Sequence, residues 1–210
     1  MTKTKLEILP SSKKPIEIFD FLTTEECKYL HDLCLQHRND NHKTVMLQKI
    51  VLAHDFVKMK CREKDSDRDE NLQHFTNIWR RIEHRLNEYF SDSVRLGDYI
   101  TISAHQGPHA VGLGRHLDSL KHNYLQGRIH DGDCYKLTCY LCADCKSGTA
   151  FYQNATVSEA FFTTTGERGS AVLFSFDTWH SGTQICHTAV KSMIGFRVCV
   201  IADKDQDKCK

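Results

Sequence analysis

Apolar residues recur every three or four positions in two segments of the N-terminal half, and this spacing predicts two amphipathic helices. The first follows Thr23 or Thr24, because either hydroxyl can cap a helix that carries Glu25 and Glu26 in its first turn. Its apolar face consists of Tyr29, Leu30, Leu33 and Cys34. The second helix covers residues 72–90, and its apolar face, expected to pack on a sheet, consists of Leu72, Phe75, Ile78, Trp79, Ile82, Leu86, Tyr89 and Phe90.

The period changes to two from residue 98 onward, which is typical of β-strands. The predicted strands cover residues 99–104, 135–141, 149–152, 171–176 and 192–202, preceded by a short strand in 16–21 and one or two strands in 45–57. Because strands crowd the C-terminal half, we expect a mainly β fold, an antiparallel sandwich or jelly roll buttressed by N-terminal helices. Residues 1–210 are expected to form one domain, with helical support in 1–95 and a jelly-roll core in 96–203.

Residues 60–71 are strongly charged, and we interpret them as a solvated loop. Asp65, Asp67 and Asp69 have the spacing that begins an EF-hand calcium loop. However, Glu70 stands where that loop needs Gly, and Thr76 stands where it needs Glu. The pattern therefore does not predict a calcium site.

Composition narrows the function classes. The formal net charge is +1 with scattered basic residues, so nucleic acid is not an expected partner. No apolar run approaches the roughly 20 residues that span a bilayer, so no membrane partner is expected. The first 15 residues lack the apolar stretch of a secretory signal. Together with 10 cysteines, this favours a reducing, intracellular location in the cytoplasm or nucleus.

Four of the cysteines form a cluster with short spacings, namely Cys134, Cys139, Cys142 and Cys145. Such spacing can indicate a zinc or iron–sulfur site. Here Cys139 and Cys142 flank Tyr140 and Leu141 in a predicted strand, so their side chains are expected to face opposite sides. We favour buried thiols that pack as small apolar side chains, with the metal cluster as the alternative.

A second metal-binding pattern is more informative. His116 and Asp118 are separated by one residue, so in an extended segment both side chains point the same way. His180 lies at the end of another extended segment and can complete a set of three ligands. Two imidazoles and one carboxylate are the ligand set that holds non-haem Fe(II) and leaves coordination positions open.

The order of motifs resembles the Fe(II)- and 2-oxoglutarate-dependent dioxygenases, most closely their prolyl 4-hydroxylase-like branch. The resemblance is carried by residues 24–30 (Thr-Glu-Glu-Cys-Lys-Tyr-Leu), 112–119 (Gly-Leu-Gly-Arg-His-Leu-Asp-Ser), 140–141, 147–151 (Ser-Gly-Thr-Ala-Phe), 168–174 (Arg-Gly-Ser-Ala-Val-Leu-Phe) and 180–182. It implies a double-stranded β-helix with iron at one mouth, held by His116, Asp118 and His180. It also implies Fe(II), 2-oxoglutarate and O2 as cofactor and co-substrates, with ascorbate as an accessory reductant.

The same resemblance implies a cation for the distal carboxylate of 2-oxoglutarate. Lys191, eleven residues after His180, has the expected offset, and Arg197 is its rival on the same strand face. Tyr140 matches a tyrosine that donates its hydroxyl to that carboxylate. The weaker pocket candidates are Thr183 and Tyr99.

The function implied is hydroxylation of a C–H bond, most closely of a prolyl residue in a protein or peptide, with release of succinate and CO2. Two alternatives stay open: a dioxygenase acting on a small molecule or a nucleic-acid base, and a jelly-roll binding module without catalysis. Residues 121–133 follow the His-x-Asp motif and are predicted to form a mobile loop over the mouth of the site. Arg115 and Trp179 adjoin the ligands and are expected to point away from the metal.

Overall fold

The computed structural model describes residues 14–40, 46–52, 65–89, 93–106, 114–118, 134–142, 147–183 and 190–201. The described elements are β1 (Ile16–Ile18), α1 (Thr24–Asp40), β2 (Met46–Leu52), α3 (Asp65–Tyr89), β3 (Ser93–Gln106), β4 (Cys134–Tyr140), β5 (Thr149–Tyr152), β6 (Phe162–Thr163), β7 (Ala171–Ser175), β8 (Trp179–Gly182) and β9 (Val190–Ile201).

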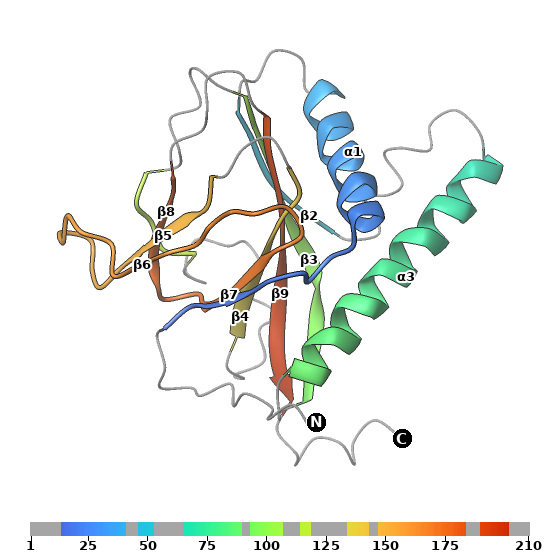
Figure 1. The fold of residues 1–210 in the computed structure, drawn as a ribbon. Coiled ribbons are helices and arrows are strands. Elements are labelled where there is room, and N and C mark those ends of the chain that lie inside the picture. Colours follow the sequence, from blue (N-terminus) through green and yellow to red (C-terminus); the bar gives the residue numbers. More distant parts are fainter. Residues whose placement is uncertain are drawn as a thin grey trace.

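Two antiparallel sheets form the β structure (Figure 1). The large sheet has six strands in the order β1-β7-β4-β9-β3-β2, and the small sheet has three in the order β6-β5-β8. Most neighbouring strands, namely β1-β7, β7-β4, β4-β9, β9-β3 and β5-β8, are not consecutive in the sequence, as in a jelly roll. The expected fold class, a mainly β jelly roll with N-terminal helices, is confirmed.

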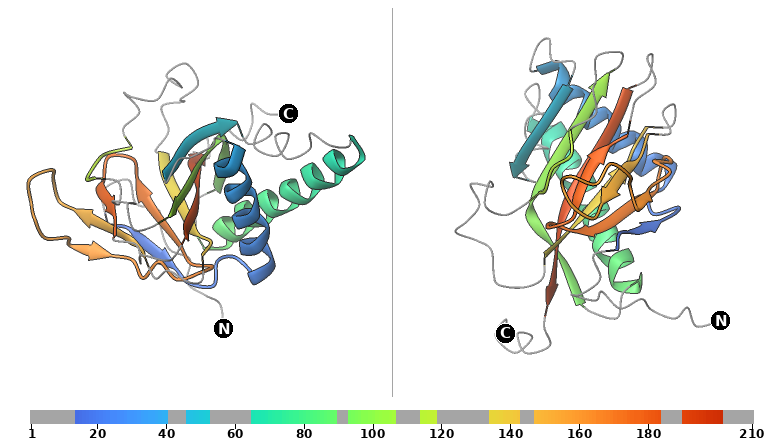
Figure 2. Two further views of the ribbon diagram at one scale, coloured as in Figure 1. Left: turned by 90° about the horizontal axis from the view of Figure 1, so that it is seen from above. Right: turned by 90° about the vertical axis from the view of Figure 1, so that its left-hand side faces the viewer.

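Both helices cover one face of the large sheet, and the small sheet lies on its other side (Figure 2). The alternation of side chains along β9 explains this layering. Ile194, Phe196 and Val198 are buried in the core that the helices share with the sheet, and Trp79 of α3 packs edge-on against Phe196 with ring centroids 5.5 Å apart. The intervening positions of β9, which include Lys191 and Arg197, face the opposite side, toward the small sheet.

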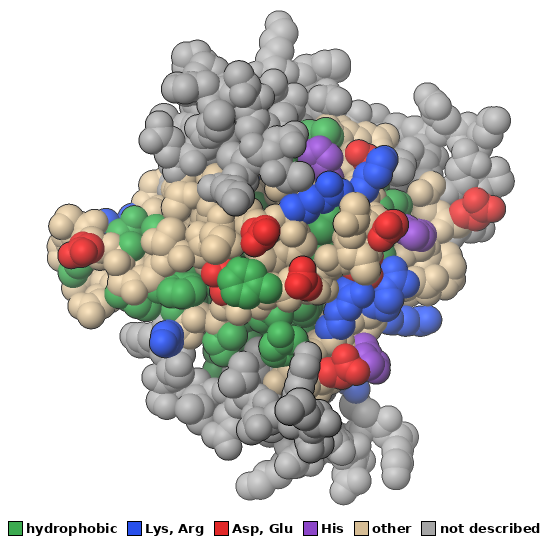
Figure 3. All heavy atoms as spheres, in the orientation of Figure 1, with side chains coloured by type: hydrophobic (Ala, Val, Ile, Leu, Met, Phe, Trp, Pro, Cys, Tyr) green, Lys and Arg blue, Asp and Glu red, His purple; other side chains and the backbone are tan. Residues whose placement is uncertain are grey.

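The apolar faces predicted for the two helices are confirmed for the described residues, whereas Phe90 lies outside them. Leu30, Leu33 and Cys34 of α1 are fully buried, as are Ile78, Ile82 and Leu86 of α3. Basic and acidic side chains are interspersed over the helical side of the molecule in Figure 3, which agrees with the small net charge. No described helix is both long and apolar enough to span a membrane.

A capping box fixes the start of α1. The Thr23 hydroxyl accepts a hydrogen bond from the Glu26 amide at 3.2 Å, and the Glu26 carboxylate accepts one from the Thr23 amide at 2.8 Å. Thr23 is therefore the cap, one of the two candidates considered. Glu26 is buried and also pairs with Arg81 and Arg85 of α3, each at 2.7 Å, so this cap ties the two helices together.

The prediction of a loop over residues 60–71 is wrong for its second half, because α3 already begins at Asp65. The helix therefore includes Asp65, Asp67 and Asp69, which precede the apolar pattern that begins at Leu72, and polar residues at a helix end do not show that pattern. This helical conformation also excludes an EF-hand loop at these aspartates, as expected.

Two further boundaries differ from the predictions. β3 begins at Ser93 instead of residue 99, because a register shift between Leu96 and Ile100 interrupts the alternating pattern without ending the strand. β6 has only two residues, too few to show a period. The proposed N-terminal leader, apart from residues 14 and 15, and the proposed loop at 121–133 lie outside the described residues.

Candidate metal centre

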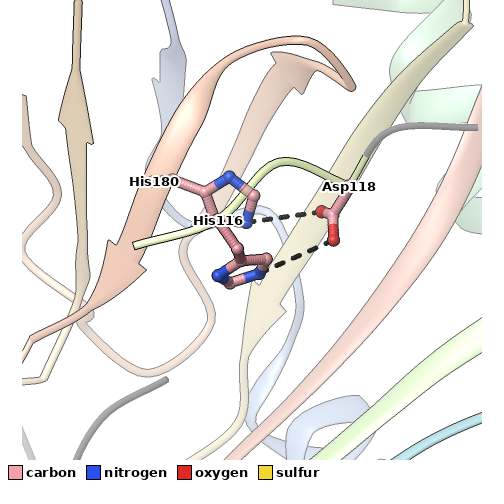
Figure 4. Close-up of side chains that lie close together, drawn as sticks. All are labelled: His116, Asp118 and His180. Atoms are coloured by element: carbon pink, nitrogen blue, oxygen red, sulfur yellow. Dashed lines mark ion pairs between the residues drawn. The ribbon is translucent and has the colours of Figure 1, made fainter. Parts of the chain in front are cut away.

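The two histidines of the predicted triad face each other across an isolated antiparallel bridge. The His116 amide donates to the His180 carbonyl at 2.9 Å, and the His180 amide donates to the His116 carbonyl at 3.0 Å. This bridge brings the ring centroids to 4.3 Å. Asp118, two residues further along, turns its carboxylate toward both rings (Figure 4).

Hydrogen bonds orient both rings. His116 Nδ1 lies 2.8 Å from the Gly114 carbonyl, and His180 Nδ1 lies 2.9 Å from the Thr178 carbonyl. Because a carbonyl only accepts, each Nδ1 carries the proton, and each Nε2 keeps its lone pair for a metal. His180 is also held against the ring of Phe174, at 4.8 Å between centroids. The imidazoles are therefore preset as ligands.

Charge prepares the third ligand. Burial opposes ionisation of Asp118, but Lys136 and His180 outweigh it and hold the pKa of Asp118 well below its ordinary value. The Lys136 ammonium lies 2.7 Å from Asp118 Oδ2. Burial, reinforced by the neighbouring His180, lowers the pKa of His116. An ionised carboxylate and a neutral imidazole are the forms that bind metal ions.

The geometry of the three ligands fits a single divalent ion. Asp118 Oδ1 lies 3.7 Å from His116 Nε2, and Asp118 Oδ2 lies 3.4 Å from His180 Nε2. Donors that share one metal at about 2.1 Å each lie within roughly 4.2 Å of one another; both of these distances meet that limit, and the donor atoms of all three residues lie within 4.8 Å of one another. Within the described residues, this is the only group of three such side chains. Two imidazoles and one carboxylate suit Fe(II) with open positions.

A polar cluster lies where β9 of the large sheet meets the residues just before β5, the strand that pairs with β8. The Lys191 side chain is almost fully buried, and its ammonium donates to Ser147 Oγ at 3.0 Å and to the Gly148 carbonyl at 2.8 Å. Thr183 joins the cluster, since Ser147 Oγ donates to its carbonyl at 2.8 Å. Gly148 is three residues from Phe151, which pairs with His180, so the cluster lies roughly 10 Å along β5 from that ligand.

Tyr140 lies next to the same cluster. Its hydroxyl is buried and lies 2.7 Å from the hydroxyls of both Thr149 and Thr164. The Lys191 ammonium lies 6.0 Å from the centroid of the Tyr140 ring. Burial raises the pKa of Tyr140, so its hydroxyl keeps the proton that it can donate. A buried ammonium beside several hydroxyls is suited to bind a carboxylate.

The other two candidates lie elsewhere in the large sheet. Arg197 pairs with Lys136 across β9 and β4, and its side-chain stem passes close to Gly97 of β3. It therefore belongs to a different part of the same sheet face from Lys191, six residues away. Tyr99 lies in β3 opposite Leu52, and its side chain is outside the described part of the structure.

Sequence reasoning missed Lys136, Ser147 and Thr164. A signal for Lys136 was present, because side chains alternate along a strand and residues 136 and 140 of one predicted strand therefore share a face. No sequence signal links Ser147 or Thr164 to Lys191 or Tyr140, since those contacts depend on the pairing of the two sheets.

Arg115 points away from the metal ligands, as expected. Its guanidinium stacks on the Tyr152 ring at 3.7 Å and donates to the carbonyls of Ala155 and Val157. These contacts attach the segment that carries His116 to the turn after β5, so Arg115 supports the ligand from outside the site.

Cys139 agrees with the interpretation as a buried thiol. It is fully buried in the core beneath α1, on the opposite side of β4 from the Tyr140 cluster. Burial raises the pKa of its thiol well above the ordinary value, which keeps it protonated and a poor metal ligand. Cys145 lies outside the described residues.

Neither a protein-family model nor a curated protein sequence matches this chain. Solved structures do. A prolyl hydroxylase from Trichoplax adhaerens, in complex with a peptide fragment of the hypoxia inducible factor oxygen degradation domain, is 14% identical with a TM-score of 0.52, covering 95% of this chain and 88% of its own. The viral collagen prolyl hydroxylase of Paramecium Bursaria Chlorella virus-1, as its 2-oxoglutarate complex, is 14% identical with a TM-score of 0.53, covering 93% of this chain and 99% of its own.

This chain has the fold of the 2-oxoglutarate-dependent oxygenases. A third match is the epimerase SnoN in complex with Fe3+, α-ketoglutarate and nogalamycin RO, 14% identical with a TM-score of 0.56, which covers 88% of this chain and 78% of its own. At these identities the likeness establishes the fold and leaves the substrate undetermined.

Proposed function

We propose that this chain is a single-domain Fe(II)- and 2-oxoglutarate-dependent dioxygenase whose catalytic core lies within residues 96–203. The observation that carries the proposal is the convergence of His116, Asp118 and His180, with the tautomers and charge that a metal requires, inside an oxygenase fold. The expected metal is Fe(II), and the co-substrates are 2-oxoglutarate and O2.

The residues of this chain would bind the metal, orient its ligands and shield the centre from water. His116, Asp118 and His180 would hold the metal, and three protein ligands would leave coordination positions available for the co-substrates. Bound iron, with 2-oxoglutarate and O2, supplies the oxidising power for hydroxylation of a C–H bond, with release of succinate and CO2. Phe151 and Phe174 pack around His180 and exclude water from that side of the centre.

Lys191 is the proposed partner of the distal carboxylate of 2-oxoglutarate. It supplies a buried positive charge 6.0 Å from the centroid of the Tyr140 ring, and the hydroxyls of Ser147 and Thr183 belong to the same cluster. Arg197 remains the rival, because it lies on the same face of β9. The burial of Lys191 and its contact with the Ser147 hydroxyl favour Lys191, since a carboxylate can accept hydrogen bonds from an ammonium and a neighbouring hydroxyl at once.

The proposed substrate is a prolyl residue of a protein or peptide. Two prolyl hydroxylases among the similar structures support this choice, one of them bound to a peptide. The SnoN complex supports the alternative of a small-molecule substrate. The small net charge and the mixed surface charges do not favour nucleic acid.

Incubation of the purified protein with Fe(II), 2-oxoglutarate, ascorbate and a panel of proline-containing peptides tests the proposal. Succinate release, together with a peptide that gains the mass of one oxygen atom, is the expected result. His116→Ala should lose both metal binding and turnover, whereas His84→Ala, at an exposed position of α3, should retain both. Product from a small-molecule panel alone would favour the alternative substrate class. If the wild-type protein releases no succinate with any substrate, the proposal of an enzyme is wrong, and the alternative of a non-catalytic binding module is favoured.

A further inference from the structure

The carboxylate of Asp118 contacts a cation as well as the two histidines. Lys136 Nζ donates to Asp118 Oδ2 at 2.7 Å, and the two side chains are only 12% and 14% exposed. This ion pair is shielded from water, so its charges act more strongly than those of a surface pair. A lysine at hydrogen-bond distance from a candidate metal-binding oxygen therefore affects how Asp118 can coordinate a metal ion.

The sheet provides space for this lysine to reach Asp118. Lys136 lies on β4, and Gly195 lies diagonal to it on β9, opposite Thr138. A Cβ atom at Gly195 would come within 2.9 Å of Lys136 Cε. The stem of Lys136 thus crosses β9 where that strand has no side chain, which places its ammonium beside Asp118.

The two oxygens of Asp118 are unequal as a result. Both oxygens face a histidine, Oδ1 facing His116 Nε2 at 3.7 Å and Oδ2 facing His180 Nε2 at 3.4 Å, but only Oδ2 also accepts the hydrogen bond from Lys136. A divalent ion bound to Oδ2 would be separated from the Lys136 ammonium only by that oxygen atom, and the two positive charges would repel each other. The ion therefore prefers Oδ1.

We propose that Lys136 is a positioning residue that restricts Asp118 to one-oxygen metal coordination through Oδ1. Bidentate coordination by Asp118 would occupy one further metal position. By opposing it, Lys136 keeps that position available to the co-substrate and limits the affinity for the metal. The inference rests on the proposed function only in that it requires a divalent metal at the triad.

Titration of the full-length protein with Co(II) under anaerobic conditions tests this role without turnover. The Lys136→Met variant keeps an unbranched side chain that is one atom shorter and removes its charge. It should bind Co(II) about tenfold more tightly, since even in water a charge about 5 Å from a divalent ion repels it by that order. Its Co(II) visible absorption should become weaker, as the coordination number increases. The Lys136→Arg variant should restore both the affinity and the spectrum of the wild type.

Lys28→Met is the matched control, because Lys28 pairs with Asp32 at 2.8 Å on the exposed face of α1. This variant should leave Co(II) affinity and spectrum unchanged. If Lys136→Met has the affinity and spectrum of the wild type, or binds Co(II) more weakly, the positioning role is wrong while the metal centre stands. If the wild type binds no Co(II), the proposed metal centre itself is wrong.

Discussion

Replacement of Lys191 by Met separates the proposed co-substrate site from the metal centre. The substitution removes an ammonium group that is almost fully buried and that donates to Ser147 Oγ and to the Gly148 carbonyl. The aliphatic stem keeps nearly the same volume, so packing is largely preserved. We expect metal binding to remain and 2-oxoglutarate binding to weaken sharply.

The expected magnitude follows from burial and charge. A hydrogen bond to a charged group contributes about 1.5–3 kcal/mol, and a buried charge left without its partner costs about 2–5 kcal/mol. The hydroxyls of Tyr140 and Thr183 remain in the variant and can still donate hydrogen bonds to the carboxylate of 2-oxoglutarate. We therefore expect a loss of binding free energy in the lower part of this range. A loss of about 3 kcal/mol corresponds to a roughly 100-fold increase in the Kd for 2-oxoglutarate.

Calorimetric titration of 2-oxoglutarate into Mn(II)-loaded protein without oxygen measures this Kd directly. Lys191→Arg should recover much of the affinity, because arginine keeps the charge. Arg197→Ala is the decisive comparison, since Arg197 is the rival cation on the same strand. If Lys191→Met leaves the Kd within about threefold of the wild type while Arg197→Ala raises it, the carboxylate binds at Arg197 and the reasoning from burial is refuted.

Two further predictions concern the scaffold. Glu26→Gln should lower the free energy of unfolding by about 2 kcal/mol at neutral pH, because it weakens the ion pairs of a buried carboxylate with the partly exposed Arg81 and Arg85 of α3. Burial opposes ionisation of Glu26, but these arginines outweigh it and lower the pKa of Glu26 from 4.5. The difference in the free energy of unfolding between variant and wild type, measured with denaturant, should therefore shrink as the pH falls below 4.5. A difference that does not change with pH would contradict this prediction. Gly148→Ala should lower the free energy of unfolding by about 3 kcal/mol, because the new Cβ would lie 2.1 Å from the Thr164 carbonyl oxygen. Gly114→Ala should leave the free energy of unfolding unchanged, because no atom lies within 4 Å of its Cβ. Equal stability of these two variants in the same assay would refute that argument.

The most regular sequence patterns predicted the structure best. The apolar spacing of α3 produced the correct buried face, and Thr23 with Glu26 marked the start of α1. Errors arose where the pattern was weak. The charged residues before Asn71 were interpreted as a loop although they continue α3, and β6 is too short to show any period. Charge alone does not distinguish a solvated loop from the exposed end of a helix.

The sequence by itself determined the local geometry of the site. Extended backbone places His116 and Asp118 on one side of their segment, and it places Lys136 on the same face of β4 as Tyr140. These relations depend only on the two-residue repeat of a strand, so they can be obtained without knowledge of the fold.

Only the tertiary structure decided which of these groups meet. His180 lies opposite His116 because β8 forms a bridge to a segment far away in the chain, and Lys191 reaches Gly148 across a separation of 43 residues. The contact of Lys136 with Asp118 likewise requires the gap that Gly195 leaves on a neighbouring strand. Such contacts follow from strand order and register, which depend on burial of the whole core and not on any local pattern.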